Sequence, residues 1–114
     1  MADAKSELYE IERLGATPVK NSGRGFHKGD AILRTDEDDP ETGYFTVDVK
    51  EYATSFGVSI KTWTKLQSDA KANSTEPMFK ICLGDDEDTR IRVVAMSEKV
   101  FLDMWEVYKC QMNT

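Results

Sequence analysis

The sequence predicts a single α/β domain in which a central mixed five-stranded sheet is flanked by helices. Its length of 114 residues is that of one compact domain and leaves no room for two. Hydrophobic residues make up 39% and charged residues 32%, a balance typical of folded soluble domains rather than disordered chains. Segments with helical spacing of apolar residues alternate with short runs of strand formers, without an internal repeat or a linker. The predicted order is helix, three strands, helix, two strands, helix.

The first half of the chain predicts one helix and three strands. Leu8, Ile11 and Leu14 recur at three-residue spacing, so we expect a helix over residues 3–14. The strands are expected at residues 17–20, 29–33 and 44–50. The acidic segment 35–43 lies between the last two strands and predicts the loop of a hairpin.

The second half predicts two helices and two strands. We expect a helix at 60–73, strands at 78–83 and 90–95, and a helix from the N-cap Ser97 to about residue 111. Trp63, Phe101 and Trp105 are expected in the core rather than as base-stacking platforms. The final helix is nevertheless a candidate dimer surface, because apolar residues occur on more than one of its faces. These residues are Val100, Phe101, Leu102, Met104, Trp105, Val107 and Tyr108.

Several classes of protein are excluded by composition. The N-terminus has neither the basic start nor the apolar stretch of a signal peptide, and the longest apolar runs are too short to span a bilayer. We therefore expect a cytoplasmic protein without membrane association. Cys82 and Cys110 are expected to be reduced and mostly buried thiols. A single histidine, His27, excludes a two-histidine metal motif.

Three residues of the predicted sheet are candidates for a shared chemical site. Asp48 and Lys50 stand two apart on one strand, so their side chains share a face, whereas Val47 and Val49 point to the other. Asp30 opens the neighbouring strand, and side chains on adjacent strands lie within about 5 Å of each other. Two close carboxylates need a cation, and Mg²⁺ prefers oxygen ligands. The simpler alternative is that Asp30 caps a turn and that Asp48 and Lys50 form an exposed pair.

The first helix adds one acid to this candidate site. At about 100° per residue, Glu7 lies about 40° from the mean direction of the apolar residues, whereas Glu10 and Glu12 lie about 100° away. Glu7 is therefore the acid expected to face the sheet, where it could reach the same ion. Glu10 and Glu12 are expected to be ordinary solvent-facing charges.

The ordered set of Glu7, Gly29-Asp30 and Asp48-Val49-Lys50 resembles the PD-(D/E)XK nuclease superfamily, and most of all its Holliday junction resolvase branch, which includes small phage-encoded nucleases. The resemblance covers about residues 5–83. Its most specific segments are Leu14-Gly15-Ala16, Asn21-Ser22-Gly23-Arg24-Gly25, Lys28-Gly29-Asp30 and Phe45-Thr46-Val47-Asp48-Val49-Lys50. Two positions depart from the superfamily pattern. Gly29 stands where the pattern has proline, and Asp48 stands where glutamate is more frequent.

The resemblance implies a role for each matching residue of the site. Asp30 and Asp48 would be metal ligands, and Glu7 would help to hold or orient the metal. Lys50 would be the catalytic lysine, which positions or activates the attacking water and offsets charge on the phosphate.

The resemblance also implies where DNA would bind. Ser22 and Arg24 match a loop that lies near the scissile phosphate. Lys28 forms a short basic patch with Arg24, although a solvated loop explains the patch equally well. Lys61, on the second helix, is a further candidate DNA contact.

The implied function is that of a Mg²⁺-dependent DNA endonuclease, with Mn²⁺ able to substitute, that hydrolyses phosphodiester bonds with a metal-activated water. A branched substrate such as a four-way junction would be cut at two symmetric positions, which implies a two-fold homodimer. Two other classes stay open. One is a non-catalytic DNA-binding accessory protein that keeps the nuclease fold, and the other is a small acidic inhibitor that mimics the charge of DNA.

The net charge of −6 would by itself argue against DNA binding, because phosphate binding needs an excess of lysine and arginine. Residues 36–41 contribute −5 and residues 85–88 contribute −4, and without these nine acids the remainder carries +3. We therefore expect both acidic runs in solvated loops that point away from the face carrying Arg24, Lys28 and Lys50. Acidic loops beside the site would instead favour mimicry of DNA.

Overall fold

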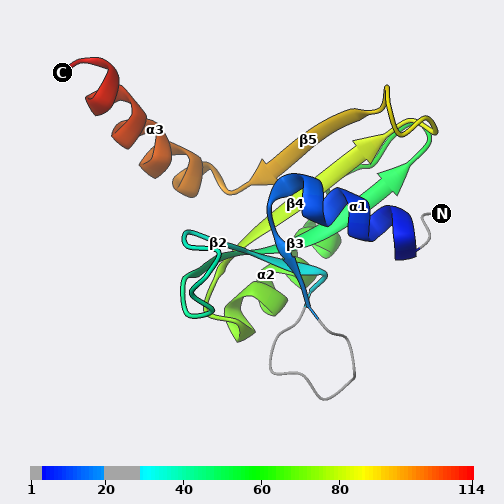
Figure 1. Cartoon of the computed structure of the whole chain (residues 1–114), viewed down its shortest axis with the longest axis horizontal. Coiled ribbons are helices and arrows are strands. Elements are labelled where there is room, and N and C mark those ends of the chain that lie inside the picture. Colours follow the sequence, from blue (N-terminus) through cyan, green and yellow to red (C-terminus); the bar gives the residue numbers. More distant parts are fainter. Residues whose placement is uncertain (1–3, 20–28) are drawn as a thin grey trace.

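The computed structural model describes residues 4–19 and 29–114 and has the predicted α/β architecture (Figure 1). Its elements in chain order are α1 (Ala4–Leu14), β1 (Thr17–Pro18), β2 (Ala31–Arg34), β3 (Gly43–Tyr52), α2 (Ile60–Ala72), β4 (Glu76–Leu83), β5 (Ile91–Met96) and α3 (Glu98–Met112). The five strands form one mixed sheet. The predicted order of helices and strands is confirmed, and the ends of the elements agree with the predicted ones to within a few residues.

The sheet has the order β1-β2-β3-β4-β5, so each strand lies beside its neighbour in sequence. β1, β2 and β3 are antiparallel in turn, β4 runs parallel to β3, and β5 is antiparallel to β4. The parallel pair requires a crossover connection, which α2 supplies. The predicted hairpin between β2 and β3 is present, and Thr35 N closes its loop by donating to Thr42 O at 3.0 Å.

Helix α1 covers the face of the sheet that the alternation in β3 marks as apolar. Ile11 is 2% exposed and lies in one buried cluster with Phe45, Val47 and Val49. Val100, in the first turn of α3, belongs to the same cluster. Helix α1 and the first turn of α3 are therefore anchored on the same face of the sheet.

Helix α2 covers the opposite face. It begins with a capping box, in which Ser59 Oγ accepts a hydrogen bond from Thr62 N and Thr62 Oγ1 accepts one from Ser59 N. Leu66 is 2% exposed and packs with Phe79 of β4. Trp63 packs against the same cluster, as predicted. The sheet thus has one apolar layer on each side.

Helix α3 leaves the sheet and projects away from the rest of the molecule (Figure 1). Ser97 is the single residue between β5 and α3, so only the first turn of the helix reaches the core, where Val100 is buried. Phe101 and Trp105 are 50% and 43% exposed, and the prediction that they lie in the core is wrong. Cys110 is exposed for the same reason, whereas Cys82 is buried as predicted. Within the described residues no helix, α3 included, is long and apolar enough to cross a membrane.

Candidate metal centre

Asp48 and Lys50 lie on the face of β3 that α2 covers. The register pairs Asp48 with Phe79 and Lys50 with Ile81, and both partners belong to the buried cluster on the α2 side. Val49, between them, belongs to the cluster on the α1 side. The strand alternation that the sequence predicts therefore holds, and both polar side chains point to one face.

Asp30 is held beside Asp48 by backbone hydrogen bonds on both of its sides. Asp30 N donates to Val47 O at 3.0 Å, and Asp30 O accepts from Val19 N at 3.0 Å. Its carboxylate is fixed as well, because Oδ2 accepts from Val49 N at 2.8 Å. The register pairs Ala31 with Val47, so the next pair along the two strands is Asp30 and Asp48. The structure thus brings together the two carboxylates that the sequence places on adjacent strands.

The charges at this place are not balanced within the described residues that form it. Two carboxylates, Asp30 and Asp48, meet one lysine, whose Nζ lies 3.2 Å from Asp48 Oδ2. Burial raises the pKa of Asp48 most, and the neighbouring Asp30 carboxyl raises it further. Lys50 opposes both effects only in part, and the pKa of Asp48 reaches about 6, against an ordinary 3.8. Asp48 is therefore a carboxylate that lacks enough positive charge around it.

Lys50 has a defined position and an open side. Its ammonium group pairs with Asp48 and lies 5.9 Å from the centre of the Phe56 ring, which favours a cation over its face. The side chains of Lys50 and Asp48 are 28% and 27% exposed. The Lys50 ammonium group is thus held by Asp48 and Phe56 and is still accessible to solvent.

Gly29, directly before Asp30, has a backbone conformation that proline cannot adopt. Its φ of +87° is a left-handed conformation, whereas the proline ring fixes φ near about −65°. A Cβ at this position would lie 2.5 Å from Cγ2 of the buried Thr46. Thr46 cannot easily move, because its hydroxyl is bonded to Thr75 Oγ1 at 2.5 Å and to Asn73 Nδ2 at 2.9 Å. Glycine is therefore the residue that lets the chain enter β2 with Asp30 in place.

Glu7 is not brought into the same group. It is half-buried on α1, and α1 packs on the face of the sheet opposite to Asp48 and Lys50. In residues 4–19 and 29–114 no three His, Cys, Asp or Glu side chains gather so that they could hold a metal ion. The role of Glu7 in metal binding therefore stays a prediction.

The predicted DNA contacts are only partly within the described structure. Ser22, Arg24 and Lys28 lie outside the described residues, and so does His27. Lys61 is exposed in the first turn of α2, on the helix that covers the face with Asp48 and Lys50. Its position fits the prediction of a contact on that face without testing it.

A second charged cluster lies on the opposite face and corrects one prediction. Glu10, expected to face solvent, is 0% exposed. Its carboxylate forms ion pairs with Lys80 Nζ at 2.8 Å, Arg92 Nε at 2.8 Å and Arg90 Nη1 at 3.3 Å. Arg90 also pairs with Glu51 at 2.6 Å. The helical-wheel argument failed because long basic side chains from β4 and the start of β5 reach the flank of α1 and cover Glu10.

In this cluster positive charge exceeds negative charge. Burial by itself would raise the pKa of Glu10, but hydrogen bonds from Arg92 and Lys80 outweigh it and lower the pKa to about 2. Burial and Glu10 also raise the pKa of the neighbouring Cys82 thiol to about 11, so this thiol is protonated and unreactive. The sequence does contain a signal for the cluster. Lys80 stands in the middle of an apolar strand, and a buried lysine there requires an acidic partner.

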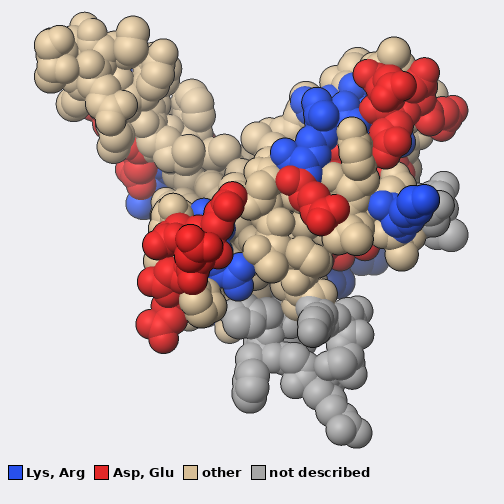
Figure 2. All heavy atoms as spheres, in the orientation of Figure 1, with Lys and Arg blue, Asp and Glu red and all other residues tan. Residues whose placement is uncertain are grey.

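The two acidic runs lie at opposite ends of the sheet (Figure 2). Residues 36–41 lie where β3 begins, and residues 85–88 lie where the parallel strands β3 and β4 end. Arg92 Nη2 donates to Glu87 O at 2.7 Å, which ties the second run to the face that α1 covers. We expected both runs to point away from Arg24, Lys28 and Lys50, but Arg24 and Lys28 lie outside the described residues.

Asp30 and Asp48 have the chemistry that a hard divalent cation requires. Mg²⁺ and Mn²⁺ prefer oxygen ligands, and Mg²⁺ is usually held by one or two carboxylates while it keeps several waters. The raised pKa of Asp48 indicates that a positive charge beside this carboxylate would be favourable. The residues present therefore fit such an ion. Protein-family models, curated proteins and solved structures show no match to this chain.

Proposed function

We propose that this protein is a metal-dependent DNA nuclease that hydrolyses phosphodiester bonds. One observation carries the proposal: Asp30, Asp48 and Lys50 come together on one face of the sheet, with two carboxylates and only one cation. This is an unfavourable arrangement for stability alone, since close carboxylates repel each other. A divalent cation and a phosphate group would supply the missing charges.

Each residue has a role that follows from its position. Asp30 and Asp48 would hold the metal, which when bound polarises the phosphate and lowers the pKa of a bound water. Lys50, fixed by Asp48 and Phe56, would orient the attacking water and offset negative charge that develops on the phosphate. Glu7 enters the proposal on the resemblance alone, because α1 packs on the opposite face of the sheet.

DNA is the proposed substrate because of the resemblance and the distribution of charge. The body of the chain carries +3 once residues 36–41 and 85–88 are set apart, and these runs lie at the two ends of the sheet. Ser22, Arg24, Lys28 and Lys61 are the proposed DNA contacts. A branched substrate, such as a four-way junction, is the proposed preference.

A cleavage assay tests this function. Purified protein is incubated with linear, flapped and four-way DNA in Mg²⁺, in Mn²⁺ and in EDTA. We expect metal-dependent cleavage that is fastest on branched DNA. Asp48→Asn and Lys50→Ala should each lower the rate by about 100- to 1000-fold, because the first removes a charged ligand of the metal and the second removes the cation that offsets charge on the phosphate. Glu7→Gln, assayed beside them, measures how much the third acid contributes to the cleavage rate.

The chain offers a matched control for these variants. Lys99 and Asp103 form an exposed ion pair of 3.3 Å on α3, which is the same pair of residue types at nearly the same distance. Lys99→Ala and Asp103→Asn should therefore leave cleavage unchanged. Absence of cleavage by the wild type, or equal cleavage by the site variants, would overturn the proposal. DNA binding without cleavage would then assign the chain to the non-catalytic class.

A further inference from the structure

The C-terminal end of α2 is tied by its side chains to the strand that carries Asp48. Asn73, the C-cap of α2, donates a hydrogen bond from Nδ2 to Thr46 Oγ1 at 2.9 Å. Thr46 precedes Asp48 on the same face of β3 and is 0% exposed. We infer that Asn73 is a positioning residue of the proposed metal site: through Thr46 it holds the backbone that delivers Asp30. The inference rests on the proposed function for its effect on metal binding, and on geometry alone for the placement of Asp30.

Thr46 can transmit position because its side chain has contacts in two directions. Its Oγ1 accepts from Asn73 and is also hydrogen-bonded to Thr75 Oγ1 at 2.5 Å. Its Cγ2 lies beside Gly29, where a Cβ would be only 2.5 Å away from it. Both groups branch from the Cβ of Thr46, so bonds that fix the hydroxyl group also fix the methyl group. The methyl group therefore fills the space beside Gly29 in one defined place.

The turn that carries Asn73 is itself fixed to the last turn of α2. Thr75 N and Thr75 Oγ1 both donate to Ala70 O, at 2.9 Å and 3.1 Å, and Asn73 N donates to the same oxygen at 3.0 Å. Ser74, between Asn73 and Thr75, has a φ of +57°, a left-handed conformation that is uncommon for a residue with a Cβ. Such a conformation persists where the surrounding structure over-determines it. Asn73 is therefore a fixed point from which Thr46 can be held.

Gly29 is the step at which this network meets the metal site. Both peptide groups of Asp30 are in backbone hydrogen bonds, and its carboxylate Oδ2 accepts from Val49 N at 2.8 Å. A rotation about the Gly29 backbone would turn the peptide that joins it to Asp30, and glycine resists such a rotation less than any other residue. The methyl group of Thr46 supplies the resistance that a side chain at position 29 would otherwise give.

The network acts by position and not by charge. Asn73, Thr46 and Thr75 are neutral, so the loss of Asn73 changes no charge near Asp30 or Asp48. An effect of Asn73 on metal binding would therefore pass through the placement of Asp30. Residues that orient metal ligands in this way typically contribute about 10- to 100-fold to metal affinity.

The amide of Val49 reports directly on the Asp30 carboxylate, because its N–H donates to Asp30 Oδ2. Its hydrogen exchange is measured by NMR in EDTA and is compared with the exchange of the β4 amides that bond to β5. Asn73→Ala should accelerate the exchange of Val49 by about 10-fold more than that of the β4 amides, which is the effect of losing about one hydrogen bond. The affinity for Mn²⁺, measured by electron paramagnetic resonance, should fall by about 10-fold.

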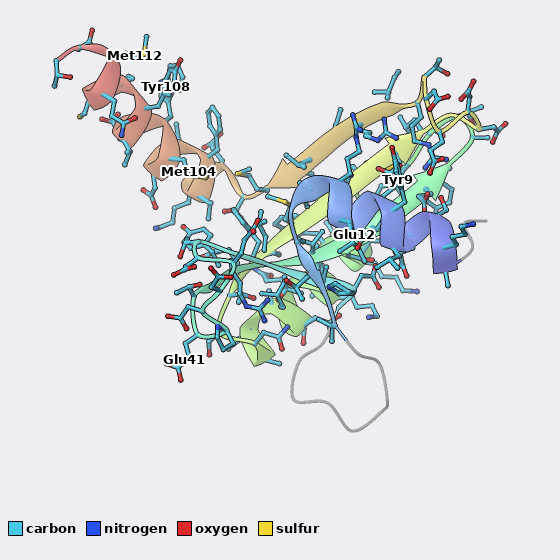
Figure 3. The ribbon with its side chains drawn as sticks, viewed as in Figure 1. Tyr9, Glu12, Glu41, Met104, Tyr108 and Met112 are labelled. Carbon is cyan, nitrogen blue, oxygen red and sulfur yellow. The ribbon has the colours of Figure 1, made fainter. Side chains whose placement is uncertain are left out.

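The chain offers a matched control for Asn73→Ala. Asn113 is also the C-cap asparagine of its helix, α3, and its N–H donates to Lys109 O at 3.1 Å. Its neighbour Met112 lies at the outer end of α3, which stands away from the sheet (Figure 3). Asn113→Ala should therefore change neither the exchange of Val49 nor the affinity for Mn²⁺.

Thr46→Ser is a second variant that leaves Asn73 in place. It keeps the hydroxyl group that bonds to Asn73 and removes the methyl group beside Gly29. Because this methyl group is the contact that reaches Gly29, Thr46→Ser should also accelerate the exchange of Val49 and weaken Mn²⁺ binding, each by about 10-fold.

The outcomes separate this inference from the proposed function. Equal acceleration of Val49 and of the β4 amides by Asn73→Ala would show a general loss of stability and would overturn the inference. Unchanged Val49 exchange or unchanged Mn²⁺ affinity in Asn73→Ala would overturn it as well, and so would Thr46→Ser without effect. A wild type that binds no Mn²⁺ overturns the metal site and the proposed function, whereas the exchange of Val49 still decides whether Asn73 holds Asp30 in place.

Discussion

The two faces of the sheet carry two charged clusters of opposite balance. On the α1 face, Glu10 is completely buried and is met by Lys80, Arg90 and Arg92. On the α2 face, Asp30 and Asp48 share one lysine, Lys50. The pKa of Glu10 is lowered to about 2, and the pKa of Asp48 is raised to about 6.

The difference separates a cluster whose charges are balanced by the fold from one whose charges are not. Cations surround Glu10 inside the protein, so its charged form is stabilised by the fold itself. Asp48 remains partly open at 27% exposure and short of positive charge, so its charged form is stabilised by whatever the solution supplies. An acid that the fold satisfies points to structure, and an acid that the fold leaves unsatisfied at an accessible place points to ligand binding.

The largest expected effect is the loss of the satisfied acid. Glu10→Gln leaves Lys80 and Arg92 without their main partner in a buried place, and breaking a buried ion pair costs about 3–5 kcal/mol. We expect the free energy of unfolding in urea to fall by this amount. Glu12→Gln, on the exposed side of the same helix, is the matched control and should change it little. If Glu10→Gln lowers the free energy of unfolding by less than about 1 kcal/mol, the cluster contributes no more than an ordinary surface ion pair.

The unsatisfied acid should behave in the opposite way. Without divalent metal, Asp48→Asn removes a repelled carboxylate and should raise the free energy of unfolding by about 3 kcal/mol, since the pKa shift from 3.8 to about 6 corresponds to about 1.4 kcal/mol per unit. Thermal melts in EDTA measure this effect. Added Mg²⁺ or Mn²⁺ should then stabilise the wild type and leave Asp48→Asn unchanged. A destabilised Asp48→Asn, or equal stabilisation of both proteins by metal, would contradict the comparison.

The third expected effect is the dependence of this difference on pH. The raised pKa means that Asp48 favours the fold fully below its ordinary pKa of 3.8 and that this contribution is lost as pH rises through about 6. Glu10 has the reverse sign: its contribution is present above 4.5 and is lost as pH falls toward about 2. The gain in stability from Asp48→Asn should therefore appear only as pH increases from about 4 to 6. An equal gain at every pH would show that charge on Asp48 is not its cause.

The fold was predictable because it depends on local patterns. Leu8, Ile11 and Leu14 mark α1, and the alternation through Val47 and Val49 marks the apolar face of β3, as the structure confirms. The same alternation, with the start of the neighbouring strand, was enough to bring Asp30 and Asp48 together. These relations extend over one strand or one hairpin, where spacing alone determines direction.

The predictions that failed depend on contacts between distant parts of the chain. Glu10 is buried by side chains about 70 to 82 positions further along the sequence, which no helical wheel contains. Phe101 and Trp105 are residue types typical of a core helix. They lie outside the core because the chain after Ser97 directs α3 away from the sheet. An apolar face indicates that a helix packs against something, but it does not indicate which part of the protein, or which other molecule, packs on it.

The left-handed conformation of Gly29 has a consequence for the residues that this position tolerates. A φ of +87° strains any residue with a Cβ, and proline, whose ring fixes φ near about −65°, cannot adopt it at all. What the site needs there is a backbone that turns closely past Thr46 and delivers Asp30 to the edge of β3. A replacement of Gly29 would therefore displace the backbone that positions Asp30, although residue 29 contributes no side chain to the site.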